Sequence, residues 1–190
     1  MIKALATFGE KLNSENVIWG VGGSVMLSFY GLADKPKDID IVVSLDSIKN
    51  AIEILDEIGE RKEVKKNSDF STRHFYKYRV DGADLDVMSG FMLNTKRGIF
   101  EYHFDEFSIA ERKEVEGVSI PLCALEDWFV LYNLMPGRLE RVKAIEEYLI
   151  KNGINNMGFL HKAIDGDIPI NIIERIKTLI DPIEHNNIYI

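Results

Sequence analysis

The alternation of apolar and polar positions divides the chain into helical and extended segments. Near the N-terminus, Ile2, Leu5, Phe8 and Leu12 follow one another at three- and four-residue steps, which places them on one face of a helix. The same spacing returns later, and Asp46 is a suitable N-cap for one of the later helices. It predicts helices over residues 24–30, 48–58, 124–134 and 138–151, and two more between residues 155 and 181.

Short runs of β-branched and aromatic residues predict strands between these helices. The run at 17–21 is continuously apolar, as expected of a strand that is buried on both faces. Asp81-Gly82 separates two extended runs and is a strong signal of a β-hairpin. The predicted strands cover residues 17–21, 38–43, 74–80, 83–88, 100–107 and 115–122, with a turn at Glu116-Gly117. The order of elements predicts an α/β (α+β) fold, with a β-rich part over residues 1–123 and a helical part over residues 124–190.

The composition is that of a folded, acidic protein. With 190 residues, 46% hydrophobic and 28% charged, the chain can bury the core of one domain or of one domain with a small appendage. The net charge of −8 disfavours a broad nucleic-acid surface, because such binding depends on Lys and Arg neutralising phosphates. A basic run from Arg61 to Lys66 alternates with glutamates and is interpreted as a solvated face.

The cysteine content and the N-terminus bear on the compartment. Cys123 is the only cysteine, so an intrachain disulfide is excluded, and its apolar neighbours favour a small buried side chain. The N-terminal residues lack a signal-peptide pattern, and no apolar run approaches the roughly 18 residues that span a bilayer. A cytoplasmic protein without membrane association is expected.

Two adjacent glycines stand between the strand that ends at Val21 and the helix that follows. Gly22 and Gly23 allow backbone N–H groups to approach a ligand closely, and Ser24 would begin the helix. Free N–H groups and the helix dipole favour an anion there. By itself, however, a Gly-Gly pair more often marks a simple turn.

Pairs of aspartates occur in two of the predicted strands. Asp38 and Asp40 are two residues apart, so both point to the same face. Two carboxylates so close repel each other unless a cation lies between them, and hard oxygen ligands favour Mg²⁺ over Zn²⁺. The alternative is a polar strand end whose aspartates cap backbone groups. The later hairpin carries Asp84 and Asp86, one of which could complete a three-carboxylate site if the strands are neighbours.

Together, the glycine–serine turn, the Asp38-Ile39-Asp40 strand and Asp86 on a later strand resemble the signature of the polymerase-β-like nucleotidyltransferase superfamily. The resemblance covers roughly residues 17 to 90 and, less specifically, residues 120–127, which look like the segment that closes small bacterial and archaeal members. It implies a mixed β-sheet flanked by helices. Residues 1–123 would form the nucleotidyltransferase-like core, and residues 124–190 a helical C-terminal region packed on it.

The resemblance also implies roles for individual residues. Three carboxylates would be ligands of Mg²⁺ or Mn²⁺ and form the catalytic centre, and the glycine–serine turn with a basic residue before the aspartate pair would hold an NTP such as ATP. The metal ligands would be Asp38, Asp40 and Asp86, and the nucleotide-binding residues Gly22, Gly23, Ser24 and Lys37. Asp86 is preferred to Asp84 because apolar residues follow it, as in the family.

The implied activity is transfer of an NMP group from an NTP to a hydroxyl of a small molecule or a protein; a long nucleic acid is not expected as acceptor. The alternative is a nucleotide-binding or partner-binding protein that has lost catalysis, as in toxin–antitoxin pairs of similar proteins. The chain departs from the family pattern at Asp34 and Pro36, where many relatives have Arg and Thr. Tyr132 and the segment from Arg138 to Arg141 replace a Lys and an Arg-x-Lys-Asp-type run, of which only Arg138 is retained.

The hairpin region supplies further candidates. Lys77 and Arg73 could reach a triphosphate, although their charge alone does not show it. The aromatic cluster of Phe70, Phe75, Tyr76 and Tyr78 is interpreted as strand packing rather than as a base-stacking platform. The four histidines show no metal-ligand spacing, and neither a G-x-S-x-G motif nor a Walker A motif occurs.

Overall fold

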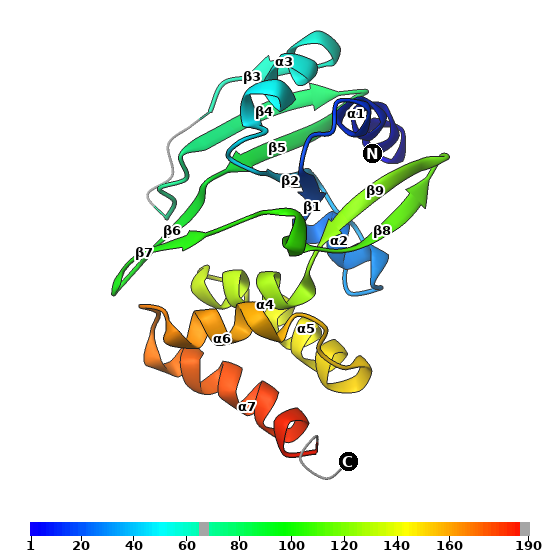
Figure 1. The fold of residues 1–190 in the computed structure, drawn as a ribbon. Helices are drawn as coiled ribbons and strands as arrows, with labels where there is room; N and C mark the ends of the chain where they lie inside the picture. The colour runs from blue at the N-terminus through cyan, green and yellow to red at the C-terminus, as the bar shows by residue number, and fades with distance from the viewer. Residues whose placement is uncertain (65–68, 187–190) are drawn as a thin grey trace.

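A seven-stranded mixed β-sheet forms the centre of the fold in the computed structural model (Figure 1). The structure describes residues 1–64 and 69–186, so Lys65 and Lys66 of the basic run lie outside the described residues. The sheet order is β3-β4-β5-β2-β1-β9-β8, in which β2 pairs with β5 and β1 with β9 in parallel, and the other neighbours are antiparallel. Its strands are β1 (Trp19–Val21), β2 (Ile39–Val43), β3 (Glu60–Lys62), β4 (His74–Val80), β5 (Ala83–Ser89), β8 (Ile109–Val115) and β9 (Val118–Cys123). Two further strands, β6 (Phe91–Thr95) and β7 (Gly98–Tyr102), pair separately.

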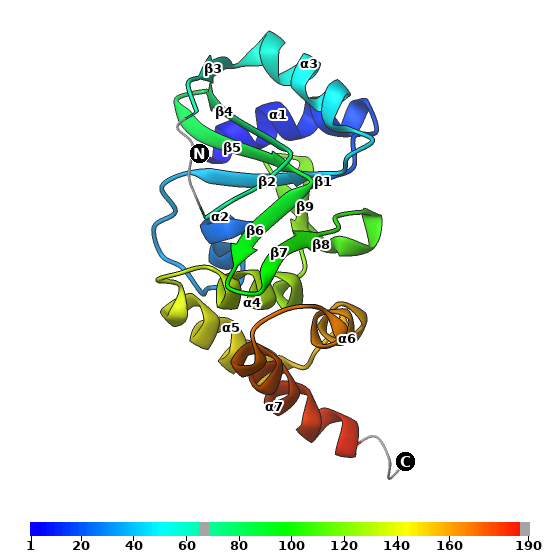
Figure 2. The same cartoon turned by 90° about the vertical axis from the view of Figure 1, so that its left-hand side faces the viewer.

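Helices cover both faces of the sheet, which confirms the predicted fold class. Figures 1 and 2 show α1 (Ile2–Ser14) and α3 (Ile48–Ile58) on one side, and α2 (Gly23–Phe29) on the other. The C-terminal helices lie beyond α2 on that second side: α4 (Leu125–Leu134), α5 (Leu139–Asn152), α6 (Met157–Asp165) and α7 (Ile170–Asn186). The cleft described below therefore lies between the sheet and these helices.

The two predicted turns form as hairpins. Asp81 and Gly82 have φ angles of 46° and 78°, and Glu116 and Gly117 have φ angles of 49° and 79°. Positive φ at both central residues is the type I′ geometry that joins antiparallel strands through two residues. The first turn fixes the register of β4 against β5, which decides which side chains meet in the site.

Several predicted boundaries were wrong. The strand predicted over residues 100–107 ends at Tyr102, and β3, β6 and β8 were not predicted as strands. Strand β8 is an edge strand that carries four consecutive charged residues from Glu111 to Glu114. Such charges protect a sheet edge from pairing with other chains, but they lack the apolar alternation that predicts a strand. Ser47, not Asp46, is the N-cap of α3, and its hydroxyl accepts a hydrogen bond from the N–H of Ile18 at 3.2 Å.

Helix α4 is buried along most of its length and anchors the other C-terminal helices. Its first turn contains two buried acids, Glu126 and Asp127. Glu126 Oε1 accepts hydrogen bonds from the N–H groups of Asn155 and Asn156 at 2.7 and 3.1 Å, just before α6. Asp127 accepts a hydrogen bond from the Tyr102 hydroxyl at 2.6 Å, which ties α4 to β7.

The buried Asp127 makes stability depend on pH. Burial raises the pKa of Asp127 to about 7, above the value of about 3.9 expected in the unfolded chain. Its contribution to stability is therefore full below about pH 4 and is lost as pH rises through 7. We expect Asp127→Asn to lose less unfolding free energy than the wild type between pH 5 and pH 8 in urea denaturation. Asp84→Asn, at an exposed carboxylate, is the matched control. If the unfolding free energy of Asp127→Asn depends on pH as steeply as that of the wild type, Asp127 is not the source of the pH dependence.

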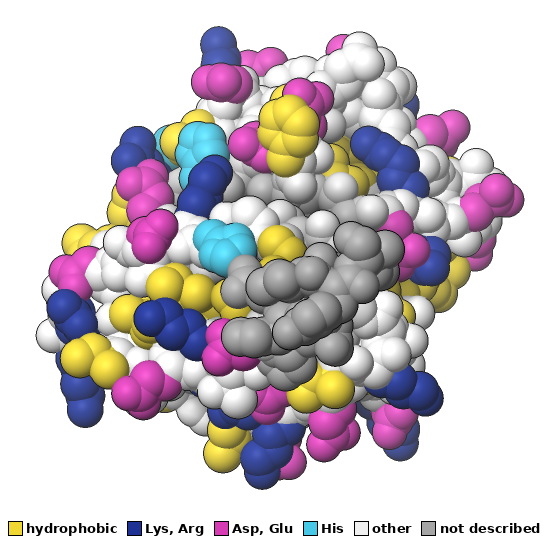
Figure 3. Space-filling model, turned by 60° about the horizontal axis from the view of Figure 1, so that its bottom comes forward, with side chains coloured by type: hydrophobic (Ala, Val, Ile, Leu, Met, Phe, Trp, Pro, Cys, Tyr) yellow, Lys and Arg dark blue, Asp and Glu magenta, His cyan; other side chains and the backbone are white. Residues whose placement is uncertain are grey.

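The outer face of the C-terminal helices carries charges of both signs. Figure 3 shows Lys and Arg interspersed with Asp and Glu there, and hydrophobic side chains in separate groups. No helix in the described part of the chain is long and apolar enough to cross a membrane.

Candidate functional site

Strand register brings the predicted carboxylates to one face of the sheet. Asp40 on β2 is directly opposite Asp86 on the parallel strand β5, and Asp86 is directly opposite Lys77 on the antiparallel strand β4. Directly opposite residues point to the same face, so these three side chains form one row across three strands. Asp38 lies two residues before Asp40 and points to the same face. Asp84 instead forms an exposed ion pair with Arg79 at 2.9 Å.

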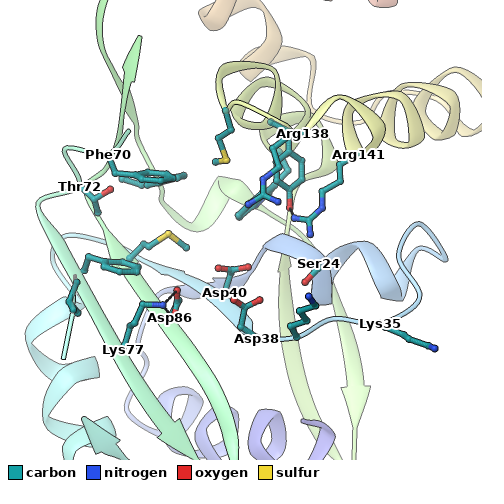
Figure 4. A pocket seen from close by; sticks show the side chains of 18 residues that line it. Ser24, Lys35, Asp38, Asp40, Phe70, Thr72, Lys77, Asp86, Arg138 and Arg141 are labelled. Carbon is teal, nitrogen blue, oxygen red and sulfur yellow. Dashed lines mark hydrogen bonds and ion pairs between the residues drawn. The ribbon is translucent and has the colours of Figure 1, made fainter. Parts of the chain in front are cut away.

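A cavity of about 780 Å³ lies above this row (Figure 4). The sheet supplies its floor, and Tyr132 of α4 and Arg141 of α5 line it from the helical side. Its charged lining residues are Lys35, Lys37, Asp38, Asp40, Lys77, Asp86, Arg138 and Arg141. Ser24 also lines it, whereas Gly22 and Gly23 lie directly behind, beneath Trp128 and Asp40. The cavity is thus open above the aspartates and is not filled by the C-terminal helices.

The glycine turn is packed against the site from behind. The N–H of Gly22 donates to the backbone carbonyl of Asp40 at 2.9 Å. A Cβ atom at Gly22 would overlap the indole of Trp128, and one at Gly23 would overlap the Asp40 carboxylate. Gly23 also has a φ of 59°. Both glycines are therefore required by close packing between the turn, β2 and α4, in addition to any approach to a ligand.

The electrostatics of the aspartates reflect their crowding. Burial, together with the charges of Asp38 and Asp86, raises the pKa of Asp40 to about 7, although Arg141 and Arg138 oppose the shift. Burial also raises the pKa of Asp86, against the opposing effect of Lys77. Asp40 is thus a carboxylate whose negative charge is not fully compensated within the protein.

The Asp38–Asp40 pair fits a divalent cation. Within the described residues, neither side chain has a hydrogen-bond or ion-pair partner, so their oxygens are available to the cavity. Mg²⁺ is commonly bound by one or two carboxylates together with substrate phosphates and water. Asp86 does not fit as it stands, because Lys77 Nζ lies 2.8 and 2.7 Å from its two oxygens. Residues 1–64 and 69–186 contain no group of three or more His, Cys, Asp or Glu side chains arranged to hold a metal ion.

Two arginines of the helical region lie across the cavity from the aspartates, and only Arg138 had been considered from the sequence. Arg141 donates a hydrogen bond to the Tyr132 hydroxyl at 3.0 Å, and its guanidinium lies 5.3 Å from the centre of the same ring. The three-residue spacing of Arg138 and Arg141 at the start of a helix places both on one side, which is a signal that the sequence contained. Lys35 was also missed, since it stands in an irregular connection.

Strand alternation divides the aromatic cluster. Phe70 and Phe75 line the cavity, and the Phe70 ring stacks on Phe91 with 5.8 Å between centroids. Tyr78 points to the opposite face, where its hydroxyl donates to Asp56 at 2.8 Å. The prediction of strand packing therefore describes Tyr78, whereas the two phenylalanines form an apolar wall of the cavity.

The fold is similar to that of solved nucleotidyltransferases. A protein of Thermotoga maritima, provisionally assigned as a nucleotidyltransferase, is 23% identical with a TM-score of 0.59, covering 79% of this chain and 92% of the other. The lincosamide antibiotic adenylyltransferase LnuA, solved with lincomycin, is 12% identical with a TM-score of 0.50, covering 76% and 95%. ANT(2″)-Ia in complex with adenylyl-2″-tobramycin is 13% identical with a TM-score of 0.50, covering 78% and 87%.

These comparisons show that the chain shares the fold of these solved proteins, which is the fold that the sequence motifs predicted. No protein-family model matches the sequence, and no curated protein matches it.

Proposed function

We propose that the protein is a nucleotidyltransferase that moves an NMP group from an NTP, bound with Mg²⁺ or Mn²⁺, to a hydroxyl of a small molecule or a protein. The observation that carries the proposal is the charge arrangement in the cavity. In a chain of net charge −8, five cationic side chains surround an aspartate pair that has no partner in the described residues. Such a site attracts a polyanion that brings its own divalent cation.

The residues divide into phosphate-binding and metal-binding groups. Lys37, Arg138 and Arg141 would bind the triphosphate, with Ser24 and the turn at Gly22–Gly23 beside it. Asp38 and Asp40 would hold the divalent ion, which, when bound, would neutralise charge at the reacting and leaving phosphates. Arginine is suited to this task because its planar guanidinium binds two phosphate oxygens at once.

The chemistry is an in-line displacement at the α-phosphorus. The bond from the acceptor oxygen to phosphorus forms, the bond from phosphorus to the bridging α–β oxygen breaks, and pyrophosphate leaves. Asp86 lies beside Asp40 and is the candidate acceptor of the hydroxyl proton, since proton removal increases the nucleophilicity of the attacking oxygen.

The cavity favours a small-molecule acceptor over a large one. Its volume of about 780 Å³ is within the range of about 300–1,000 Å³ typical of small-ligand pockets. Phe70, Phe75 and Phe91 provide an apolar wall for the acceptor or the base. The names of two structural neighbours, a lincosamide adenylyltransferase and the ANT(2″)-Ia complex with an adenylylated antibiotic, support the same acceptor class.

The experiment that tests this function is incubation of the wild-type protein with Mg²⁺ and each of the four NTPs labelled at the α-phosphate. Candidate acceptors are hydroxylated small molecules and the protein itself. We expect labelled NMP on an acceptor with stoichiometric pyrophosphate release. Absence of NTP binding to the folded wild-type protein would refute the proposal.

Substitution of Arg141 tests the phosphate-binding role. A charge-assisted hydrogen bond contributes about 1.5–3 kcal/mol, so we expect Arg141→Met to weaken NTP binding by about 10- to 100-fold. The measurement is calorimetric titration with a non-hydrolysable NTP and Mg²⁺. Arg112→Met on β8 removes an exposed arginine outside the cavity and is expected to bind as the wild type does. Equal affinities for both variants would contradict the assignment.

A further inference from the structure

The third carboxylate of the site already has a cation. Lys77 Nζ lies 2.8 Å from Asp86 Oδ1 and 2.7 Å from Asp86 Oδ2, so one ammonium group contacts both oxygens. The Asp86 side chain is only 13% exposed. The Lys77 ammonium also lies 5.5 Å from the centre of the Phe75 ring, which adds a cation–π contact.

This pairing is built into the strand register. Lys77 is directly opposite Asp86 in the antiparallel β4–β5 pair, and the turn at Asp81-Gly82 fixes that register. Withdrawal of Lys77 would leave a largely buried carboxylate without its partner, which is costly in a region of low dielectric. The ammonium group therefore belongs to the site rather than to a mobile surface side chain.

The position of this ammonium group matters because of its neighbour across the sheet. In the row Lys77–Asp86–Asp40, Asp86 lies between a protein cation and the aspartate pair that fits a divalent ion. A second divalent ion bound by Asp86 would need the same oxygens that Lys77 contacts, and would lie close to the ammonium charge.

We propose that Lys77 takes the place of a second metal ion at Asp86, so that the site binds a single divalent ion, at Asp38 and Asp40, together with the nucleotide. Lys77 is a positioning residue: it holds Asp86 by both oxygens and supplies positive charge beside the reacting phosphate. This inference rests on the proposed function, since it concerns the metal content of the same site.

The test counts Mn²⁺ ions in the complex with an α,β-methylene NTP by electron paramagnetic resonance. Two Mn²⁺ ions sharing a site at about 4 Å are magnetically coupled, whereas a single bound ion gives an uncoupled spectrum. We expect one uncoupled Mn²⁺ per chain in the wild type. Lys77→Met should bind two coupled ions, because both oxygens of Asp86 become available, and Lys77→Arg should still bind one.

Arg79→Met is the matched control. Arg79 and Asp84 form the next directly opposite ion pair of the same two strands, outside the cavity, so this variant should bind one ion as the wild type does. A coupled pair in the wild type, or one ion in folded Lys77→Met, overturns the proposal for Lys77 while leaving nucleotidyl transfer intact. Absence of any nucleotide-dependent Mn²⁺ binding overturns both. The number of Mn²⁺ ions bound by the wild-type protein tests the proposal even if Lys77→Met does not fold.

Discussion

Asp40→Asn is expected to lower the rate of NMP transfer on the order of 10³-fold without unfolding the protein, a loss of ~4 kcal/mol of transition-state stabilisation. Burial, together with the charges of Asp38 and Asp86, raises the pKa of Asp40 to about 7. An amide at this position keeps the shape of the side chain but removes the charge that a divalent ion requires.

The same substitution should not destabilise the fold. The raised pKa means that the Asp40 charge opposes folding above pH 7, so its removal should leave the unfolding free energy at pH 8 unchanged or higher. The hydrogen bond from the Gly22 N–H goes to the backbone carbonyl of Asp40 and survives the change. A rate assay and urea denaturation of the same preparation measure both effects.

Asp84→Asn is the control for Asp40→Asn. It removes an aspartate from the neighbouring strand, but at an exposed position outside the cavity, and should keep wild-type activity. A folded Asp40→Asn protein that transfers NMP at the wild-type rate would exclude Asp40 from the chemistry.

The fold was largely predictable where periodicity and turn chemistry agree. The buried strand at Trp19–Val21 and the hairpin around Asp81-Gly82 follow from local rules that tertiary structure did not override. Strand β8 escaped prediction because its charged residues serve the sheet edge, a property of its place in the sheet rather than of its own sequence.

The site was predictable only in part, because a sequence motif identifies residues of a site but not the side chains that they contact in the fold. Asp38, Asp40 and Asp86 do line one cavity, yet the ion pair between Lys77 and Asp86 depends on cross-strand register, which the sequence indicates only through the turn. Arg141 reaches the same cavity from a helix about a hundred positions later in the chain than Asp38. The spacing of Arg138 and Arg141 indicates that both lie on one side of the helix, but not that this side faces the aspartates, since that depends on how α5 packs against α4.

Gly23→Ala should disable the site through a steric clash, and Gly31→Ala separates that effect from backbone strain. Both glycines have positive φ, 59° at Gly23 and 71° at Gly31, so an alanine at either costs about 1–2 kcal/mol of stability. An added Cβ at Gly31 meets nothing within 4 Å, whereas one at Gly23 overlaps the Asp40 carboxylate. Either Asp40 or the turn must therefore move in Gly23→Ala.

A displacement of about 1 Å in a catalytic group can lower a rate by about 10²-fold, so Gly23→Ala is expected to lose at least that much NMP transfer, and Gly31→Ala almost none. A double-mutant cycle identifies the cause: Gly23→Ala should cost less unfolding free energy in an Asp40→Ala background, where the overlapping carboxylate is absent. Equal costs in both backgrounds would show that strain at φ 59°, rather than contact with Asp40, makes Gly23 necessary. Gly23 would then be required by its backbone geometry, whereas Gly22 would still be required by its packing against Trp128.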